Sequence, residues 1–317
     1  MVTVIRTKRN SPILTHSGLA CLSTLPTINL TTGCLHDCLY CYIRGYRNYP
    51  GEGRVILYED TLDRLRQELR LAATKPHAVY FSPSSDLFQP APGILELSHS
   101  ILEFLFSEGI GVAFLTKGVI PDCTLQLLME HRELVRAQIG LITPDEGMSR
   151  IFEPHAASPG RRLLQLKTLI EGGIEAEARL DPILPGLTDS PELLHEHLAS
   201  LAGVGVKRTA AGVLFLRPGI LYWLKSRVSD RGMLALLLHA YQEGQQAAMR
   251  GAQYPILNLA TEARREIFDR LKRAAAAHSI EIKICACKNA DLARGSCNIA
   301  GTWSRRADPV QPLLVTV

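Results

Sequence analysis

The stretch Thr31-Thr32-Gly33-Cys34-Leu35-His36-Asp37-Cys38-Leu39-Tyr40-Cys41-Tyr42 places three thiols in one short segment, directly after the apolar run 25–30. Cys34, Cys38 and Cys41 follow a Cys-x3-Cys-x2-Cys spacing. Three thiolates this close can hold a compact inorganic centre, one ligand short of the four that close a zinc site or a cubane iron–sulfur cluster. The motif therefore predicts a metal centre with an open position. The alternatives are a zinc loop with a distant fourth ligand and three unrelated buried thiols.

The composition is that of a globular protein with a sizeable core. Of the 317 residues, 46% are hydrophobic and 21% are charged. The 35 basic and 31 acidic residues leave a formal charge of +4, without the dense basic run of a nucleic-acid-binding surface. We expect no signal peptide and no membrane span, since the sequence shows neither pattern. Six of the eight cysteines fall into two triplets, so we predict a reducing, cytoplasmic location.

Helix and strand patterns alternate after the cysteine segment. Strands are expected at about 26–32, 77–81, 111–116, 138–142, 174–180 and 207–216. Helices are expected to begin near Asp60, 92, Pro121, Ser158-Pro159 and Ser190-Pro191, where capping residues or prolines mark a first turn. Six strand–helix repeats with short connections favour parallel strands joined by right-handed crossovers. The fold class predicted is α/β, a partial (β/α)6 TIM-type barrel.

The pattern becomes mainly helical after about residue 220. Helices are expected near 228–249 and 258–278, followed by a strand near 279–285. We therefore predict an N-terminal extension over 1–24, the partial barrel over 25–220, and a C-terminal extension over 221–317 that carries the second cysteine triplet.

Cys34, Cys38 and Cys41, with Tyr40 before the last of them, resemble the cluster signature of the radical S-adenosylmethionine (SAM) superfamily. The segments 82–90, 153–162 and 181–189 resemble parts of spore photoproduct lyase and its relatives, so the resemblance covers roughly residues 27–220. It implies a [4Fe–4S] cluster on the three cysteines and SAM on the fourth iron. It also implies reductive cleavage of SAM to a 5′-deoxyadenosyl radical that acts on an organic substrate, with flavodoxin or ferredoxin as electron donor.

The resemblance leaves the substrate open. Spore photoproduct lyase repairs a thymine dimer in DNA, but no basic groove is evident here, so we favour a small-molecule or thiol-bound substrate over DNA photoproduct repair. The rival from another class is a non-catalytic iron–sulfur or zinc protein that senses or scaffolds.

Polar residues at the ends of the predicted strands are the candidates for SAM binding, because site residues of α/β barrels gather there. Arg179 lies on an apolar strand and needs an anionic partner, either the SAM carboxylate or a neighbouring acid such as Asp181. Asp86 could bind ribose hydroxyls or the substrate, or act only as a cap. The full set of predicted cofactor-binding residues is Tyr40, against which SAM would stack, with Ser82, Ser84, Asp86, Thr116, Lys117, Thr143 and Arg179.

A second cysteine triplet, Cys285, Cys287 and Cys297, lies near the C-terminal end. Residues two apart on a strand point to the same side, and the turn at Gly295-Ser296 could return Cys297 to the other two. Three interpretations stay open: an auxiliary iron–sulfur cluster completed by another ligand, thiols that act in catalysis or bind a soft substrate such as arsenite, and a structural zinc site or buried thiols. The second would permit transfer of the 3-amino-3-carboxypropyl group of SAM. Cys21 is expected to be a buried small hydrophobe, with a minor prospect of being a ligand.

Overall fold

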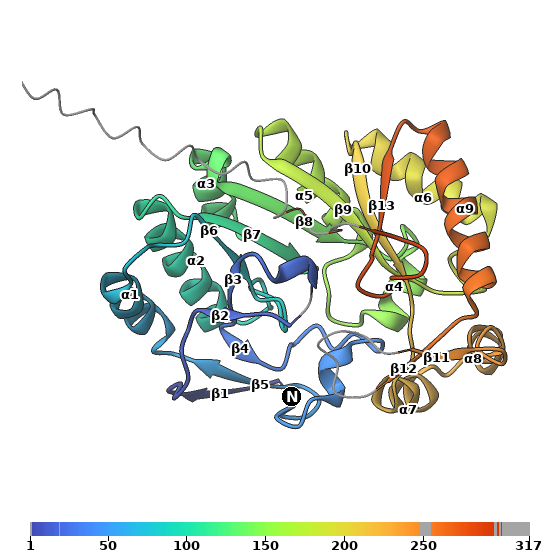
Figure 1. The fold of residues 1–317 in the computed structure, drawn as a ribbon, viewed down its shortest axis with the longest axis horizontal. Coiled ribbons are helices and arrows are strands. Elements are labelled where there is room, and N and C mark those ends of the chain that lie inside the picture. Colours follow the sequence, from blue (N-terminus) through green and yellow to red (C-terminus); the bar gives the residue numbers. More distant parts are fainter. Residues whose placement is uncertain (1, 19, 248–254, 295–296, 298, 300–317) are drawn as a thin grey trace, which may run out of the picture.

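Seven parallel strands form the centre of the fold, and their order across the sheet follows their order along the chain. The computed structural model describes residues 2–18, 20–247, 255–294, 297 and 299. The sheet runs in the order β13-β10-β9-β8-β7-β6-β3-β2 (Figure 1). The parallel strands are β3 (Pro26–Ile28), β6 (Ala78–Phe81), β7 (Gly111–Thr116), β8 (Val135–Gly140), β9 (Glu175–Ile183), β10 (Arg208–Val213) and β13 (Glu281–Ile284).

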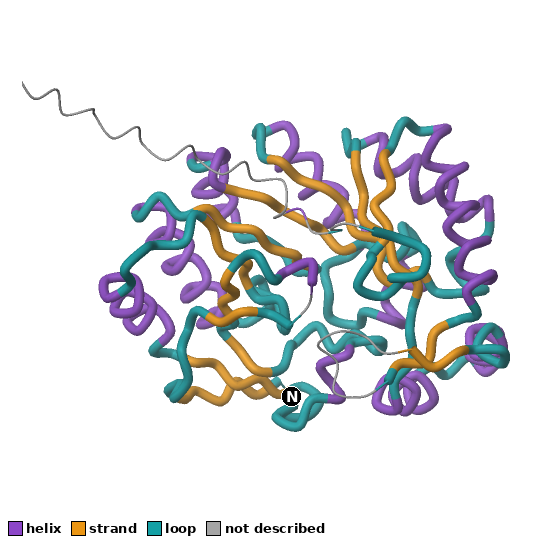
Figure 2. Tube along the Cα trace, viewed as in Figure 1, coloured by secondary structure: helices purple, strands orange, loops and turns teal. Residues whose placement is uncertain are grey.

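Helices connect these strands and cover the outer side of the sheet (Figure 2). They are α1 (Thr61–Leu71), α2 (Pro92–Ser107), α3 (Asp122–Glu130), α4 (Glu146–Phe152), α5 (Pro159–Glu171), α6 (Pro191–Gly203) and α9 (Thr261–Ala277). The side chains of Ser158 and Ser190 accept backbone N–H groups at the starts of α5 and α6, as predicted. Asp60 makes no such cap on α1, because its carboxylate accepts the N–H of Arg9 at 3.0 Å.

The sheet is the predicted partial barrel with one strand more than expected. β13 falls in the segment predicted as a C-terminal extension, yet it pairs in parallel with β10, in the register Arg208 to Glu281. At the opposite end of the sheet, the short strand β2 (Thr15–His16) pairs antiparallel with β3. The two edges of the open barrel are therefore β2 and β13.

Smaller elements flank the sheet. β1 (Thr3–Thr7), β5 (Arg54–Tyr58) and β4 (Thr31–Thr32) make a three-stranded sheet, so the predicted strand 26–32 is divided between two sheets. After β10 come α7 (Pro218–Arg227), α8 (Arg231–His239) and the hairpin of β11 (Gln245–Ala247) and β12 (Ile256–Asn258). The helix predicted over 228–249 is thus shorter, because residues 245–247 pair with β12. Short 3-10 turns lie at Ala20–Leu22, Tyr42–Gly45 and Arg132–Leu134.

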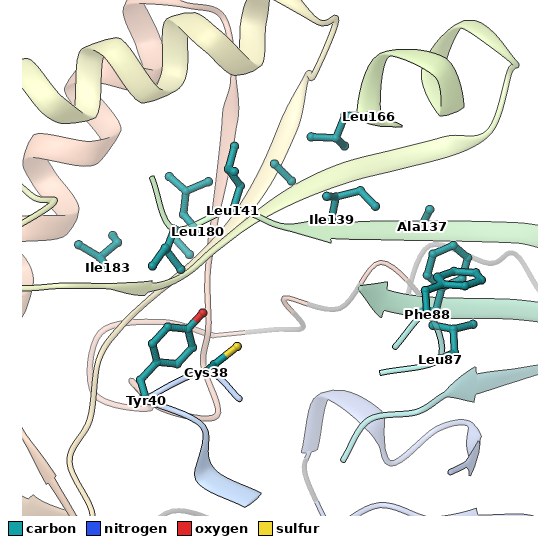
Figure 3. Packing of buried hydrophobic residues seen from close by; sticks show 14 of the residues in the cluster. Cys38, Tyr40, Leu87, Phe88, Ala137, Ile139, Leu141, Leu166, Leu180 and Ile183 are labelled. Atoms are coloured by element: carbon teal, nitrogen blue, oxygen red, sulfur yellow. The ribbon is translucent and has the colours of Figure 1, made fainter. Parts of the chain in front are cut away.

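The core lies between the sheet and its helices and extends to the cysteine segment. Phe81, Phe114 and Ile139 are fully buried on the strands. Figure 3 shows Cys38 and Tyr40 beside the strand residues Leu180 and Ile183 of the same cluster. Because Cys38 and Tyr40 belong to the same cluster as the strand residues, the cysteine segment is held by the same apolar packing as the barrel. Burial of each large apolar side chain contributes about 1.5–3 kcal/mol to the free energy of folding. None of the helices within the described ranges is long and apolar enough to cross a bilayer.

The α6 helix buries a histidine in a site that disfavours its charged form. His197 is buried, and its Nε2 has no hydrogen-bond partner. Burial, together with the charge of Arg162, lowers the pKa of His197 to about 3. In the unfolded chain a histidine takes up its proton near pH 6.5, so between these values the unfolded state binds more protons than the folded state.

We predict that this histidine makes the protein acid-sensitive. The free energy of unfolding falls as the pH drops below about 6.5, by up to about 1.4 kcal/mol per pH unit from this group. The substitution His197→Leu should make the pH dependence of urea unfolding between about pH 6 and pH 4 shallower by roughly that slope. The same change at His195, which is exposed on α6, serves as the control. An unchanged slope in His197→Leu would contradict the assignment.

Candidate active site

The cysteine loop begins with a turn that only glycine accommodates well. Gly33 has a φ of +89°, in the region where L side chains are strained. A Cβ at this position would lie 2.8 Å from Cγ of Pro50 and 2.9 Å from the carbonyl oxygen of Arg54. The chain therefore turns sharply out of β4, and Cys34 follows directly.

The buried Arg44 holds the middle of the loop from within. Its guanidinium donates to the carbonyl oxygens of Asp37 and Cys38, at 2.7 and 3.1 Å, and lies 3.3 Å from the Asp37 carboxylate. The same group packs over the ring of Trp223 on α7, 4.3 Å from its centroid. Because these donors are charged, the bonds are stronger than neutral ones, and they fix the backbone between the first two cysteines.

Tyr40 connects the loop to a buried ion pair. Its hydroxyl donates to the carboxylate of Glu153, which lies 2.6 Å from a guanidinium nitrogen of Arg162, and both charged side chains are fully buried. Arg162 also donates to the carbonyl oxygen of Gly140 and to Oγ of Ser149, at 2.7 and 2.8 Å. Burial and the negative charge of Glu153 raise the pKa of Tyr40, so the phenol stays protonated and remains a donor.

This arrangement differs from the expectation that SAM stacks near Tyr40. The ring points into the core toward the β9 side (Figure 3) and does not line the cavity described next. Because Tyr40 is next to Cys41 in the sequence, we expected its ring to lie beside the metal centre. Instead, its hydroxyl is directed to Glu153, a buried acceptor in the connection between α4 and α5.

A cavity of about 420 Å³ lies beside the loop, with Cys34, Cys38 and Cys41 on its wall. This volume is in the range of small-molecule sites. Burial raises the pKa of all three thiols, so thiolates form here only with a compensating positive charge, such as a bound metal centre. Three such thiols beside a cavity are a fitting donor set for a [4Fe–4S] cluster with one open iron.

Most of the predicted cofactor residues line the same cavity as the cysteines. Ser82, Ser84, Asp86, Thr116, Lys117 and Arg179 line the cavity. Ser82 has a φ of +55°, and its buried hydroxyl has no hydrogen-bond partner. Thr143 does not line the cavity; its hydroxyl accepts the N–H of Asp145 at 3.1 Å, at the start of α4.

Asp86 is fully engaged with protein groups. Its carboxylate accepts the hydroxyl of Thr116 at 2.7 Å and the N–H of Lys117 at 2.8 Å, and lies 3.2 Å from Nε2 of His36. Burial alone would raise the pKa of Asp86, but the charge and hydrogen bond of His36 and two backbone N–H donors outweigh it and lower the pKa. The carboxylate therefore links the cysteine loop to the end of β7.

Arg179 is neutralised by an acid of its own strand. Its guanidinium lies 2.9 Å from the carboxylate of Asp181, which also binds Lys288 at 2.5 Å. Burial would raise the pKa of Asp181, but these two cations lower it. Of the two alternatives foreseen for Arg179, the salt bridge is the one that the structure describes, and its role toward SAM stays a prediction.

Several cavity residues were not anticipated. Tyr42, Tyr46, Phe215 and Arg217 line the cavity. Nε of Arg217 is buried without a hydrogen-bond partner, and its guanidinium lies 5.3 Å from the centroid of the Phe215 ring. Within the described ranges, Arg217 forms no ion pair. Arg217 directly follows the predicted strand 207–216. This position at a strand end could have identified it as a candidate site residue.

The second triplet also reaches the cavity. Cys285 and Cys287 lie on its wall, as does Cys21, and the buried Cys297 contacts Arg179 through its sulfur, 3.6 Å from a guanidinium nitrogen. The structure thus brings the two cysteine groups, one from each end of the sequence, to one site.

The family model of the radical SAM superfamily matches residues 28–198, the span that carries the cysteine loop and the four parallel strands from β6 to β9. This chain belongs to the radical SAM superfamily. Membership supports an enzyme that uses a [4Fe–4S] cluster and SAM. Among solved structures, a spore photoproduct lyase mutant superposes with a TM-score of 0.69 at 16% identity, over 89% of this chain and 82% of that one. At this identity the likeness establishes the shared fold.

Relatives by sequence include the uncharacterized protein Rv2578c of Mycobacterium tuberculosis, which is 29% identical over 206 residues, 62% of this chain and 61% of that protein. A radical SAM Nalpha-GlyT isomerase of Pseudomonas phage M6 is 26% identical over 184 residues, 56% of this chain and 38% of that protein. The match thus spans less than two thirds of the length of these relatives.

We predict that breaking the buried ion pair destabilises the fold strongly. Arg162→Met leaves the carboxylate of Glu153 buried without its cation, a change that costs roughly 3–5 kcal/mol. Urea unfolding of the apoprotein measures the loss. Arg150→Met on α4 is the matched control, because Arg150 and its partner Glu146 are 4.0 Å apart and exposed, and such pairs contribute at most about 1 kcal/mol. Equal effects of the two substitutions would refute the role of Glu153 and Arg162.

Proposed function

We propose that this protein generates a 5′-deoxyadenosyl radical from SAM and uses it to remove a hydrogen atom from an organic substrate. The observation that carries the proposal is the cavity bounded by three cysteines of one loop and by strand-end polar side chains. When bound, the cluster and SAM supply the electron transfer and the radical, which side chains alone do not provide. The residues of the chain bind, orient and shield these groups.

Each wall of the cavity has a distinct task in this proposal. Cys34, Cys38 and Cys41 would hold the cluster and leave an open position at which SAM could bind. The unpartnered hydroxyl of Ser82 is available as a hydrogen-bonding group for the amino group. The hydroxyl of Tyr42 donates to the carbonyl oxygen of Pro83 at 2.6 Å. This hydrogen bond fixes the cysteine loop to the segment that follows β6.

Arg217 is better placed than Arg179 to bind the SAM carboxylate. Asp181 neutralises Arg179, whereas Arg217 lines the cavity with a buried Nε that lacks an acceptor. Burial lowers the pKa of Arg217, and a bound carboxylate would relieve the desolvation of its charge. We therefore assign the carboxylate to Arg217.

The substrate is proposed to be a small molecule rather than DNA, and the electron donor a flavodoxin or ferredoxin.

The thiols beside the cavity are the reason to consider a second reaction, transfer of the 3-amino-3-carboxypropyl group of SAM to a soft acceptor. All eight cysteines are free, which supports the proposal of a reducing compartment.

The reaction is tested by product analysis. Protein reconstituted with iron and sulfide under anaerobic conditions should convert SAM to 5′-deoxyadenosine when dithionite is added. Cys38→Ser should abolish this product and lower the iron content of the reconstituted protein, because a cluster on two thiolates is not held. Cys123→Ser, at an exposed thiol of α3, should change neither. Formation of methylthioadenosine instead would favour carboxypropyl transfer, and the absence of both products would overturn the enzyme assignment.

The role of Arg217 is tested by SAM affinity. Loss of a charge-assisted hydrogen bond costs about 1.5–3 kcal/mol, so Arg217→Gln should weaken SAM binding to the reconstituted protein by roughly 10- to 100-fold. Arg227→Gln, at an exposed arginine of α7 paired with Glu52, is the control and should leave the affinity unchanged. If Arg217→Gln binds SAM like the wild type, the carboxylate has another partner.

A further inference from the structure

Four thiols gather where the two edges of the open barrel approach the cavity. Cys285 follows directly after β13, the last strand of the sheet, and Cys287 lies two residues further on. Cys21 lies in the 3-10 turn that follows β2, the strand at the opposite edge. With Cys297 they form one cluster around the buried Ala210 of β10. The thiols therefore come from both sides of the seam that the sheet leaves open.

The four thiols belong to one cluster of side chains. Cys285 and Cys297 are buried together with Ala210 of β10, and the partly buried Cys21 and Cys287 pack against them. Cys21, Cys285 and Cys287 also line the cavity. The set has the number and chemistry of ligands that close a four-thiolate metal site.

The segment that carries Cys285 and Cys287 is built rigidly. The N–H of Cys285 donates to the carbonyl oxygen of Ala211 at 2.8 Å, and its own carbonyl oxygen accepts the side-chain amide of Asn289 at 2.9 Å. Arg264 of α9 in turn donates to the buried Asn289 at 2.9 Å and pairs with Asp291 at 2.6 Å. Such outer contacts are those that orient the ligands of metal sites.

Positive charge lies beside the sulfurs. Arg179 donates to Sγ of Cys297 at 3.6 Å, and Lys288 follows Cys287 in the chain and pairs with Asp181. Four thiolates carry a net negative charge even with a metal centre bound, and nearby cations offset part of it. The ion pair of Arg179 with Asp181 holds the guanidinium at this place.

We propose that Cys21, Cys285, Cys287 and Cys297 hold a second metal centre, ligated entirely by the protein, that joins the two edges of the barrel. The ligand class is a thiophilic centre, a [4Fe–4S] cluster or a zinc ion. Among the residues that the structure places, no three His, Cys, Asp or Glu side chains converge on the position of a single ion, so the wider cluster is the occupant we expect. With four protein ligands this centre has no vacant position for SAM or for arsenite.

The experiment isolates this centre by removing the ligands of the first one. In a Cys34→Ala/Cys38→Ala/Cys41→Ala variant, reconstituted anaerobically, we expect about four irons and four sulfides per chain. Adding Cys21→Ser should remove them, whereas adding Cys123→Ser should not. One zinc per chain that is lost with Cys21→Ser would also support the site and identify zinc as its occupant. The readout is metal content, so it is independent of SAM cleavage.

Two results would overturn the proposal: a triple variant that binds neither iron nor zinc, or metal content that does not depend on Cys21. Far-ultraviolet circular dichroism and gel filtration establish that each variant is folded. Cys287→Ser in the same background removes a second ligand, this one from the other edge of the sheet. This variant should lose the metal as Cys21→Ser does. Retention of metal in both single-ligand variants likewise contradicts a four-thiolate site.

Discussion

The buried ion pair of Glu153 and Arg162 is the constraint on which the cysteine loop depends. Two charges removed from water are tolerated only when they are paired and hydrogen-bonded, and here the carboxylate accepts Tyr40 from the loop while the guanidinium binds the end of β8. Backbone bonds run alongside: the N–H of Leu39 donates to the carbonyl oxygen of Phe152 at 2.9 Å. The loop position is therefore set by these contacts with the rest of the barrel, in addition to the bonds that Arg44 makes within the loop.

The polar side chains around the cavity fall into two groups, those with protein partners and those with buried polar atoms that lack one. Asp86, Asp181 and Arg179 are saturated by protein partners and act as fixed joints between strand ends. Ser82 and Arg217 have buried polar atoms without partners, and unsatisfied buried groups are costly unless a ligand completes them. The polar groups that remain incomplete are thus the candidates for ligand binding, and the saturated groups belong to the framework, although all of them face one cavity.

Sequence patterns predicted the order of strands and helices, because apolar runs and capping residues are local signals. The three-cysteine loop was equally readable from spacing. The roles of Tyr40 and Thr143 were not, since the direction of each side chain depends on acceptors that are distant in sequence or on a local turn. Cys21 was set aside because it stands alone in the chain, and only the fold, with β2 and β13 at the two edges of the open barrel, brings it near the other thiols.

The position of β13 in the sheet has a consequence for biosynthesis. On the ribosome, the six preceding parallel strands emerge first and can assemble from the N-terminal side. Until β13 arrives, the edge of β10 at Ala210 and Ala211 offers unpaired backbone groups to other chains. The nascent protein therefore passes through a stage that is prone to edge-to-edge association, and a product truncated before Glu281 would stay in it.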